Sequence, residues 1–306
     1  MREPSLGSGD APSQPWIEQP ERGVGLTMRV IVWIALTVGR RAARLVLYPI
    51  CLYFLVFSVT ARTASAAYLR RALGRKARVS DLFRHYYSFA STILDRVFFL
   101  KSRYDAFDIN VVGEDLVRHI TSTAEGCLLI GAHVGSFEVL RALARRDADV
   151  PVSMVMYEEN ARKLNQVLSA INPRALADVI PLGTVDSMLK VQNALARGEF
   201  VGMLADRGIE GEGTLACRFL GDDARFPLGP FRLAAMLKRP IILMIGLYRG
   251  GNRYDIHFEQ LPDLRHVERA QRDEALDHAI KAYAARLEHY CRIAPYNWFN
   301  FYDFWA

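Results

Sequence analysis

Short apolar runs alternate with segments of helical periodicity from about residue 80 to the end of the chain. The apolar runs span residues 127–132, 152–156, 179–182, 200–205, 241–248 and 254–260. The helical segments span residues 137–146, 160–171, 184–196 and 230–237, and 263–293 has the pattern of one charged amphipathic helix packed on the outside. Strands that alternate with helices build a mostly parallel sheet. The sequence therefore predicts an α/β fold with helices on both faces of a central sheet.

The last two apolar runs predict a β-hairpin. They are separated by residues 249–253, which include Gly250 and Gly251, and glycines of this kind are typical of tight hairpin turns. We expect this hairpin to form the edge of the sheet.

The composition excludes a disordered chain and argues against nucleic-acid binding. Hydrophobic residues make up 51% of the 306 residues, so the chain can bury a sizeable core. Lys and Arg total 39 against 33 Asp and Glu, and this excess is not gathered in basic tails of the kind that bind nucleic acid. The cysteines lack the spacing of a zinc site or a small disulfide framework. We expect reduced thiols in a protein that faces the cytoplasm.

Residues 1–25 are predicted to be a disordered tail. The segment is rich in proline and glycine and has few apolar side chains, so it cannot bury enough surface to offset the entropy lost on ordering. Acidic residues precede the first apolar run, which is not the charge pattern of a cleaved signal peptide.

Residues 26–62 are predicted to be a membrane-anchoring helical segment. The stretch 45–61 carries no charge and is bounded by Arg44 and Arg62. As one helix it would be about 25 Å long against roughly 30 Å of hydrocarbon, so a span, an interfacial helix and a helix pair dipping into one leaflet stay open. A buried helix of a soluble core is a further alternative, although the aromatic side chains are too dense for an ordinary amphipathic helix. The basic cluster within 70–78 favours the cytoplasmic leaflet.

The most informative motif surrounds the end of the first apolar run. That run leads into His133, the chain turns at Gly135 and Ser136, and a helix starts with Glu138 in its first turn. Ligands bind at the carboxyl ends of strands in open α/β sheets. An acid bound to one ring nitrogen would fix the tautomer and leave the other nitrogen to take a proton from an attacking hydroxyl. In the structural alternative, Ser136 caps the helix and Glu138 complements its dipole.

These residues resemble the signature of the lysophospholipid acyltransferase superfamily, in which four residues separate the histidine from an acid. Later segments resemble the superfamily's branch of late acyltransferases from lipid A biosynthesis, and they are 203–208 (MLADRG), 217–221 (CRFLG), 224–230 (ARFPLGP) and 294–299 (APYNWF). The resemblance covers about residues 28–303. The aromatic run 297–305 departs from the arginine-rich ending of the lipid A enzymes and is similar to that of relatives encoded with aryl polyene lipid pathways.

The resemblance implies transfer of an acyl group from an acyl carrier protein or coenzyme A thioester to a hydroxyl of a membrane lipid or glycolipid. Residues 63–306 would be the acyltransferase catalytic domain, with His133 as general base and Glu138 as the acid that orients it. No metal, no cofactor beyond the thioester co-substrate and no covalent acyl-enzyme is required. A thioester is already activated, so deprotonating the alcohol and stabilising the tetrahedral oxyanion suffices.

Other residues are expected at the same edge of the sheet. Asp206 and Arg207 follow the run 200–205, either as site residues or as a structural ion pair. Arg207 and the backbone N–H groups near Gly229 are candidate oxyanion donors. The complete set of substrate-binding or oxyanion candidates is Asp206, Arg207, Gly229, Asn160 and Arg162, of which the last two are suggested as acceptor contacts by the resemblance. Leu228 stands where phosphoglycerol acyltransferases of the superfamily usually have Glu, which argues against a glycerolipid acceptor.

The expected partners are a membrane lipid acceptor and an acyl carrier protein, with no nucleic acid. A carrier protein is acidic, and the net charge of +6 suits that encounter. We expect attachment to the bacterial inner membrane with the catalytic domain on the cytoplasmic face. Two other functions stay open. One is a catalytically silent, membrane-anchored lipid-binding protein of the same fold, and the other is a lipid esterase or thioesterase that uses the same base to activate water.

Overall fold

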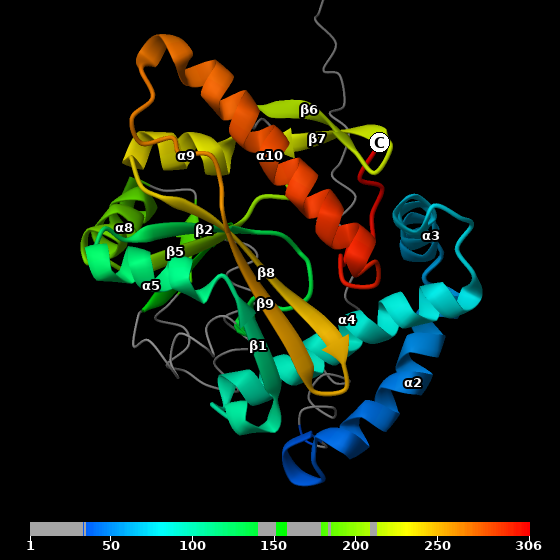
Figure 1. Cartoon of the computed structure of the whole chain (residues 1–306). Coiled ribbons are helices and arrows are strands. Elements are labelled where there is room, and N and C mark those ends of the chain that lie inside the picture. Colours follow the sequence, from blue (N-terminus) through cyan, green and yellow to red (C-terminus); the bar gives the residue numbers. More distant parts are fainter. Residues whose placement is uncertain (1–32, 34, 140–150, 158–178, 183–184, 209–212) are drawn as a thin grey trace, which may run out of the picture.

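The computed structural model of the chain describes residues 33, 35–139, 151–157, 179–182, 185–208 and 213–306. A seven-stranded sheet lies at its centre, with helices on both faces (Figure 1). The strands of this sheet are β1 (Asp108–Val112), β2 (Cys127–Gly131), β3 (Val152–Tyr157), β4 (Val179–Leu182), β5 (Phe200–Leu204), β8 (Ile241–Gly250) and β9 (Arg253–Gln260). The order is β1-β9-β8-β2-β5-β3-β4. Every neighbouring pair is parallel except β8 and β9, so the predicted α/β fold is confirmed.

Each predicted apolar run forms a strand of the sheet, but the place of the hairpin was predicted wrongly. β8 and β9 do form an antiparallel hairpin. The edge beyond β9 is covered by β1, which pairs with it in parallel. The sequence analysis also missed a separate two-stranded sheet of β6 (Thr214–Phe219) and β7 (Asp222–Pro227). Both β1 and β6 alternate exposed and more buried residues, which gives a weaker apolar signal than a fully buried strand.

The described helices are α2 (Arg40–Phe57), α3 (Val59–Leu73), α4 (Val79–Leu100), α5 (Glu114–Thr123), α8 (Val185–Ala196), α9 (Gly229–Leu237) and α10 (Arg272–Ile293). Those predicted over 184–196 and 230–237 are confirmed as α8 and α9. The long helix predicted over 263–293 begins only at Arg272, after a short 3-10 turn. Residues 160–171 and most of 137–146 lie outside the described residues.

The N-terminal apolar stretch is not a single helix. α2 ends at Phe57, Ser58 leaves the helical conformation, and α3 starts at Val59 with its axis turned by 95°. Among the described residues no lone helix has the length and apolarity to cross a bilayer, whereas this bent pair taken together has both. The domain boundary predicted between residues 62 and 63 falls inside α3, which runs through it without a break.

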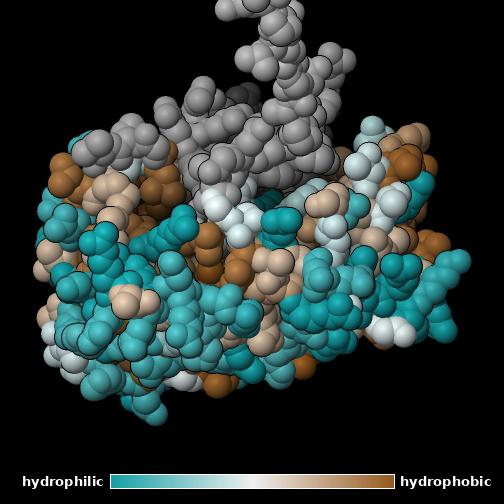
Figure 2. Space-filling model, turned by 90° about the horizontal axis from the view of Figure 1, so that it is seen from above, coloured by the Kyte–Doolittle hydropathy of each residue, from teal (hydrophilic) through white to brown (hydrophobic). Residues whose placement is uncertain are grey.

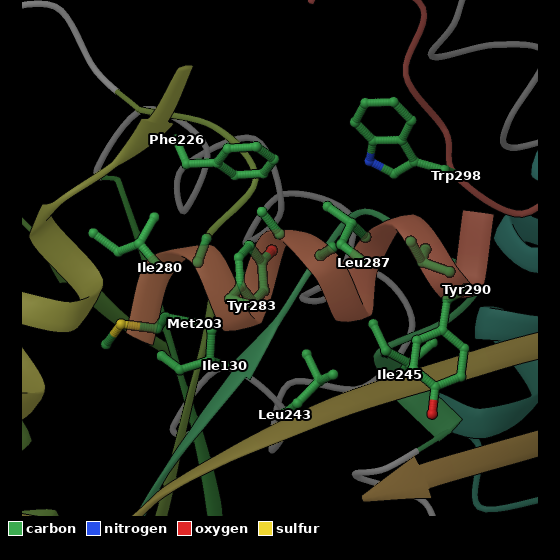
Figure 3. Close-up of a cluster of buried hydrophobic side chains, with 14 of the residues drawn as sticks. Ile130, Met203, Phe226, Leu243, Ile245, Ile280, Tyr283, Leu287, Tyr290 and Trp298 are labelled. Atoms are coloured by element: carbon green, nitrogen blue, oxygen red, sulfur yellow. The ribbon is translucent and has the colours of Figure 1, made fainter. Parts of the chain in front are cut away.

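The two faces of the sheet pack on different helices because neighbouring residues of a strand point to opposite sides. Ile130 of β2 and Ile245 of β8 lie against α10, where Tyr283 and Leu287 meet them (Figure 3). On the opposite face, Leu129 is packed with a second cluster to which α4 contributes. The side chains that α10 buries recur every three or four residues, as Leu276, Ile280, Tyr283, Leu287 and Tyr290, and each such burial stabilises the fold by about 1.5–3 kcal/mol.

Candidate active site

The histidine and its acid come from two adjacent parallel strands. β2 and β5 pair with Gly131 opposite Leu204, and His133 and Asp206 each lie two residues beyond the end of their strand. The Nδ1 atom of His133 lies 2.8 Å from the Oδ1 atom of Asp206. The backbone N–H of His133 donates to the other carboxylate oxygen, Oδ2, at 3.1 Å. Strand pairing therefore places the carboxylate against both the ring and the backbone of the histidine.

Glu138 is not the acid that holds the ring, so that part of the sequence prediction is wrong. Its Oε1 atom accepts a hydrogen bond of 2.7 Å from Nη2 of Arg96, which comes from α4. Glu138 is 5% exposed, and the hydrogen bond that an acid was expected to make with the ring is made by Asp206, at Nδ1. The turn between His133 and the helix start directs the two side chains to different partners. Although they are close in sequence, no hydrogen bond joins the His133 ring to the Glu138 carboxylate within the described residues.

The imidazole of His133 is partly exposed, unlike the carboxylate that holds it. The side chain of His133 is 34% exposed, whereas Asp206 is 1% exposed. Within the part of the chain that the structure describes, no hydrogen bond is recorded for the Nε2 atom of His133. Nδ1 therefore anchors the ring, and a general base held in this way would act through its other nitrogen, Nε2.

The turn after His133 depends on two glycines. Gly135 has a φ of +60°, and a Cβ atom on it would lie 1.9 Å from the carbonyl oxygen of Gly246. That same carbonyl accepts a hydrogen bond of 2.8 Å from the N–H of Ser136. On the sheet beneath, Gly202 leaves room for the ring of Phe137, which would lie 2.2 Å from an added Cβ atom. Backbone and ring approach the sheet this closely because side chains are absent there.

A C-terminal segment, residues 295–299, closes the site from the other side. The N–H of Gly135 donates to the carbonyl of Asn297, and the N–H of Phe299 donates to the carbonyl of His133, both at 2.8 Å. The indole N–H of Trp298 donates to Oδ2 of Asp206 at 2.9 Å. Sequence analysis placed Trp298 only within the family-like segment 294–299 and the aromatic run 297–305, and it missed this hydrogen bond. No local signal links an indole to a carboxylate 92 positions earlier.

Burial dominates the electrostatics of the pair. Desolvation lowers the pKa of His133 below its ordinary value of 6.5 and the charge of Arg207 lowers it further, while Asp206 acts in the opposite direction. Desolvation alone would raise the pKa of Asp206. The charge and hydrogen bond of His133, together with Arg207 and the Trp298 indole, outweigh it and hold that pKa well below its usual range. At neutral pH the site therefore holds a neutral imidazole beside an ionised carboxylate.

The remaining predicted site residues are only partly brought together. Arg207 lies at the dyad, where its Nη2 donates to the carbonyl of Phe299 at 2.9 Å and its guanidinium lies 5.0 Å from the ring centre of Tyr302. Gly229 is the first residue of α9, and no contact with the dyad is recorded for it within the described chain. Asn160 and Arg162 lie outside the described residues.

Comparison with known proteins gives one family. Residues 23–306 match the model of the bacterial lipid A biosynthesis acyltransferases, which confirms the resemblance drawn from the sequence motifs. Among solved structures, the chain is similar to the 1-acyl-sn-glycerophosphate (LPA) acyltransferase PlsC from Thermotoga maritima. The identity is 15%, the match covers 81% of this chain and 98% of that one, and the TM-score is 0.38. A search of curated proteins finds none that matches.

Proposed function

Because the chain belongs to the bacterial lipid A biosynthesis acyltransferase family and is therefore an acyltransferase of lipid biosynthesis, we propose that His133 is the general base of its reaction. In this proposal the acyl group moves from an acyl carrier protein or coenzyme A thioester to a hydroxyl of a membrane lipid or glycolipid. The observation that carries the proposal is the hydrogen bond of 2.8 Å between His133 Nδ1 and Asp206 Oδ1. In this proposal the acid that orients the base is Asp206 and not Glu138.

The proposed reaction needs one base and no covalent enzyme intermediate. Asp206 accepts a hydrogen bond from the protonated Nδ1 of His133, so the unprotonated Nε2 is the atom that takes the hydroxyl proton. The alcohol oxygen attacks the thioester carbonyl and a tetrahedral oxyanion forms. When that oxyanion collapses, the carbon–sulfur bond breaks, and the leaving thiolate receives the proton held by His133. The ester and the free thiol are the products, and the imidazole is neutral again.

Arg207 is proposed to stabilise the oxyanion. Its guanidinium lies in the same cluster as the dyad, where its charge lowers the pKa of His133. Its Nε atom is buried without a hydrogen-bond partner in the described structure. A preorganised donor of this kind contributes about 3–4 kcal/mol to transition-state stabilisation. The N–H groups at the start of α9, including that of Gly229, are retained as a second candidate donor set.

We propose that α2 and the start of α3 dock on the membrane. Large apolar side chains of α2 remain exposed, among them Leu45 (70%), Tyr53 (58%) and Phe57 (67%). In the view from above, most of the coloured residues are hydrophilic, and hydrophobic ones gather at the left and right margins (Figure 2). Contiguous exposed apolar surface of this kind marks a lipid or protein contact, and the exposed Arg70 in the last turn of α3 suits anionic headgroups. We place the enzyme at the cytoplasmic face of the inner membrane.

Vesicle binding tests the docking surface. Leu45→Glu with Phe57→Glu should abolish co-sedimentation with vesicles that contain phosphatidylglycerol. Met236→Glu is the matched control, because Met236 is 60% exposed on α9, away from the proposed surface. Equal binding by both variants would refute docking through α2.

The reaction is tested by supplying the purified protein with acyl carrier protein or coenzyme A thioesters and a total membrane lipid extract, followed by mass spectrometry. We expect an acylated lipid with the native chain and none with His133→Ala, which should still fold and bind vesicles. Release of free fatty acid without an acylated lipid would favour the esterase or thioesterase. Lipid binding without turnover by the native chain would favour the silent binding protein.

A further inference from the structure

A chain of buried hydrogen bonds connects α3 to the proposed catalytic pair. The hydroxyl of Ser65 lies 2.7 Å from Nδ1 of His85. Nε2 of His85 lies 2.8 Å from the carbonyl oxygen of Trp298, whose indole N–H is bound to Asp206. Ser65 and His85 are completely buried, and Trp298 and Asp206 are each 1% exposed. The chain therefore runs from a helix of the proposed membrane-docking pair to the carboxylate that holds His133.

The chemistry of the partners fixes the direction of each hydrogen bond. A carbonyl oxygen accepts only, so Nε2 of His85 carries the proton and donates to Trp298. A neutral ring with that tautomer accepts at Nδ1, so the Ser65 hydroxyl is the donor there. Burial supports this protonation state because desolvation lowers the pKa of His85 to about 4. The indole N–H of Trp298 is a donor only, and it donates to Asp206.

We propose that Trp298 and His85 are positioning residues for the acyl transfer proposed above, on which this inference rests. A carboxylate attached through a single bond can rotate. Two donors on Oδ2 of Asp206, the backbone N–H of His133 and the indole of Trp298, leave Oδ1 facing Nδ1 of His133. His85 holds the backbone of Trp298 in place. Both act through another residue: the Trp298 indole binds Asp206, and His85 binds the Trp298 backbone.

The surroundings of Trp298 are built to fix the plane of its indole. Tyr68, Phe219 and Phe304 meet the ring edge to face, with centroids 5.0, 5.3 and 4.9 Å away. The backbone of the same segment is fastened to α3, since the hydroxyl of Tyr68 donates to the carbonyl of Pro295 at 2.8 Å. Packing alone would not need a buried imidazole with both nitrogens bound, because an apolar side chain fills such space without the cost of desolvating polar atoms.

Replacing the indole N–H without changing the ring tests the role of Trp298. Site-specific incorporation of β-(3-benzothienyl)alanine at position 298 puts a sulfur where the N–H was. We expect kcat to fall by about tenfold or more, the effect of losing one hydrogen bond to a charged group, with the KM values for donor and acceptor unchanged. The same replacement at Trp305 is the control, since its indole nitrogen is buried and makes no recorded hydrogen bond in the described chain. An unchanged kcat for the 298 variant would overturn the proposal.

Two conservative variants of His85 test its two hydrogen bonds separately. His85→Gln places an amide N–H near the position of Nε2 and retains a donor for the Trp298 carbonyl. His85→Asn retains an acceptor for Ser65 and loses that donor. We expect His85→Gln to keep most of the native kcat and His85→Asn to lose about tenfold, at comparable thermal stability. Equal kcat values in the two variants would show that His85 only packs.

His133→Ala distinguishes failure of this inference from failure of the proposed reaction. If His133→Ala retains lipid acylation, the general-base proposal itself is wrong. If His133→Ala is inactive and the position 298 variant is not impaired, the base stands and the positioning role falls.

Discussion

Asp206 and His133 are 73 residues apart in sequence and 2.8 Å apart in space. The parallel pairing of β2 with β5 brings them together, because both residues follow the carboxyl ends of neighbouring strands. A third segment of the chain also holds the Asp206 carboxylate. Oδ2 is bound by the histidine backbone and by Trp298 of the C-terminal segment. The site therefore joins two strand ends and the last residues of the chain.

The pH dependence of kcat/KM should have its acid limb centred below pH 6.5. Burial and the charge of Arg207 lower the pKa of His133, and the base acts in its neutral form, so activity persists as the pH falls until that lowered pKa is reached. Arg207→Gln removes one of the two lowering effects and should move the limb to higher pH. Lys281→Gln, which removes an exposed charge paired with Asp277 on α10, should leave the limb in place. A native limb above pH 6.5 would contradict the protonation state described for His133.

Gly135→Ala should lower the free energy of unfolding far more than Gly251→Ala, although both glycines have a left-handed backbone conformation. Gly135 and Gly251 have φ values of +60° and +62°, but an added Cβ atom meets the Gly246 carbonyl only at Gly135, and nothing within 4 Å at Gly251. We expect Gly251→Ala to lower the free energy of unfolding by about 1 kcal/mol, from the left-handed conformation alone. Gly135→Ala should cost about 3 kcal/mol or more. Urea unfolding of both variants measures the difference, and similar losses would show that the turn adapts.

Apolar strands could be located from the sequence because their signal is local. The runs that became β2 and β5 are buried at nearly every position, so they stand out without knowledge of their neighbours. The order of the strands depends on contacts between distant segments. No sequence pattern links β1 to β9, yet the two strands pair in the sheet. For the same reason the acid was assigned to Glu138, which is near His133 in sequence, whereas the pairing of strands delivers Asp206. Asp206 itself was expected at this edge because it follows an apolar run.

Arg40→Met should destabilise the junction between α2 and the rest of the fold. Arg40 binds both carboxylate oxygens of Asp95, each at 2.7 Å, and the side chain of Asp95 is fully buried. Removing the cation leaves a buried carboxylate that, among the described residues, keeps one side-chain hydrogen bond, from the hydroxyl of Tyr254. The loss should cost about 3 kcal/mol.

Lys190→Met is the control for this substitution, because the Lys190–Asp186 pair is exposed on both sides and exposed pairs contribute little. Thermal and urea unfolding would measure both. An Arg40→Met variant as stable as the control would mean that Asp95 is solvated or protonated in the folded chain.

The central claim is tested most directly by comparing the lipid acylation rates of two single variants, Asp206→Asn and its control Glu138→Gln. Asparagine retains the shape of the carboxylate, but it removes the charge that stabilises the protonated imidazole and sets its tautomer. The rate of lipid acylation at saturating donor and acceptor should fall by about 10³–10⁴-fold, as for other histidine bases that lose their acid. Glu138→Gln, whose carboxylate binds Arg96, should lose much less. A Glu138→Gln variant impaired as severely as Asp206→Asn, or an Asp206→Asn variant with near-native rate, would contradict the account.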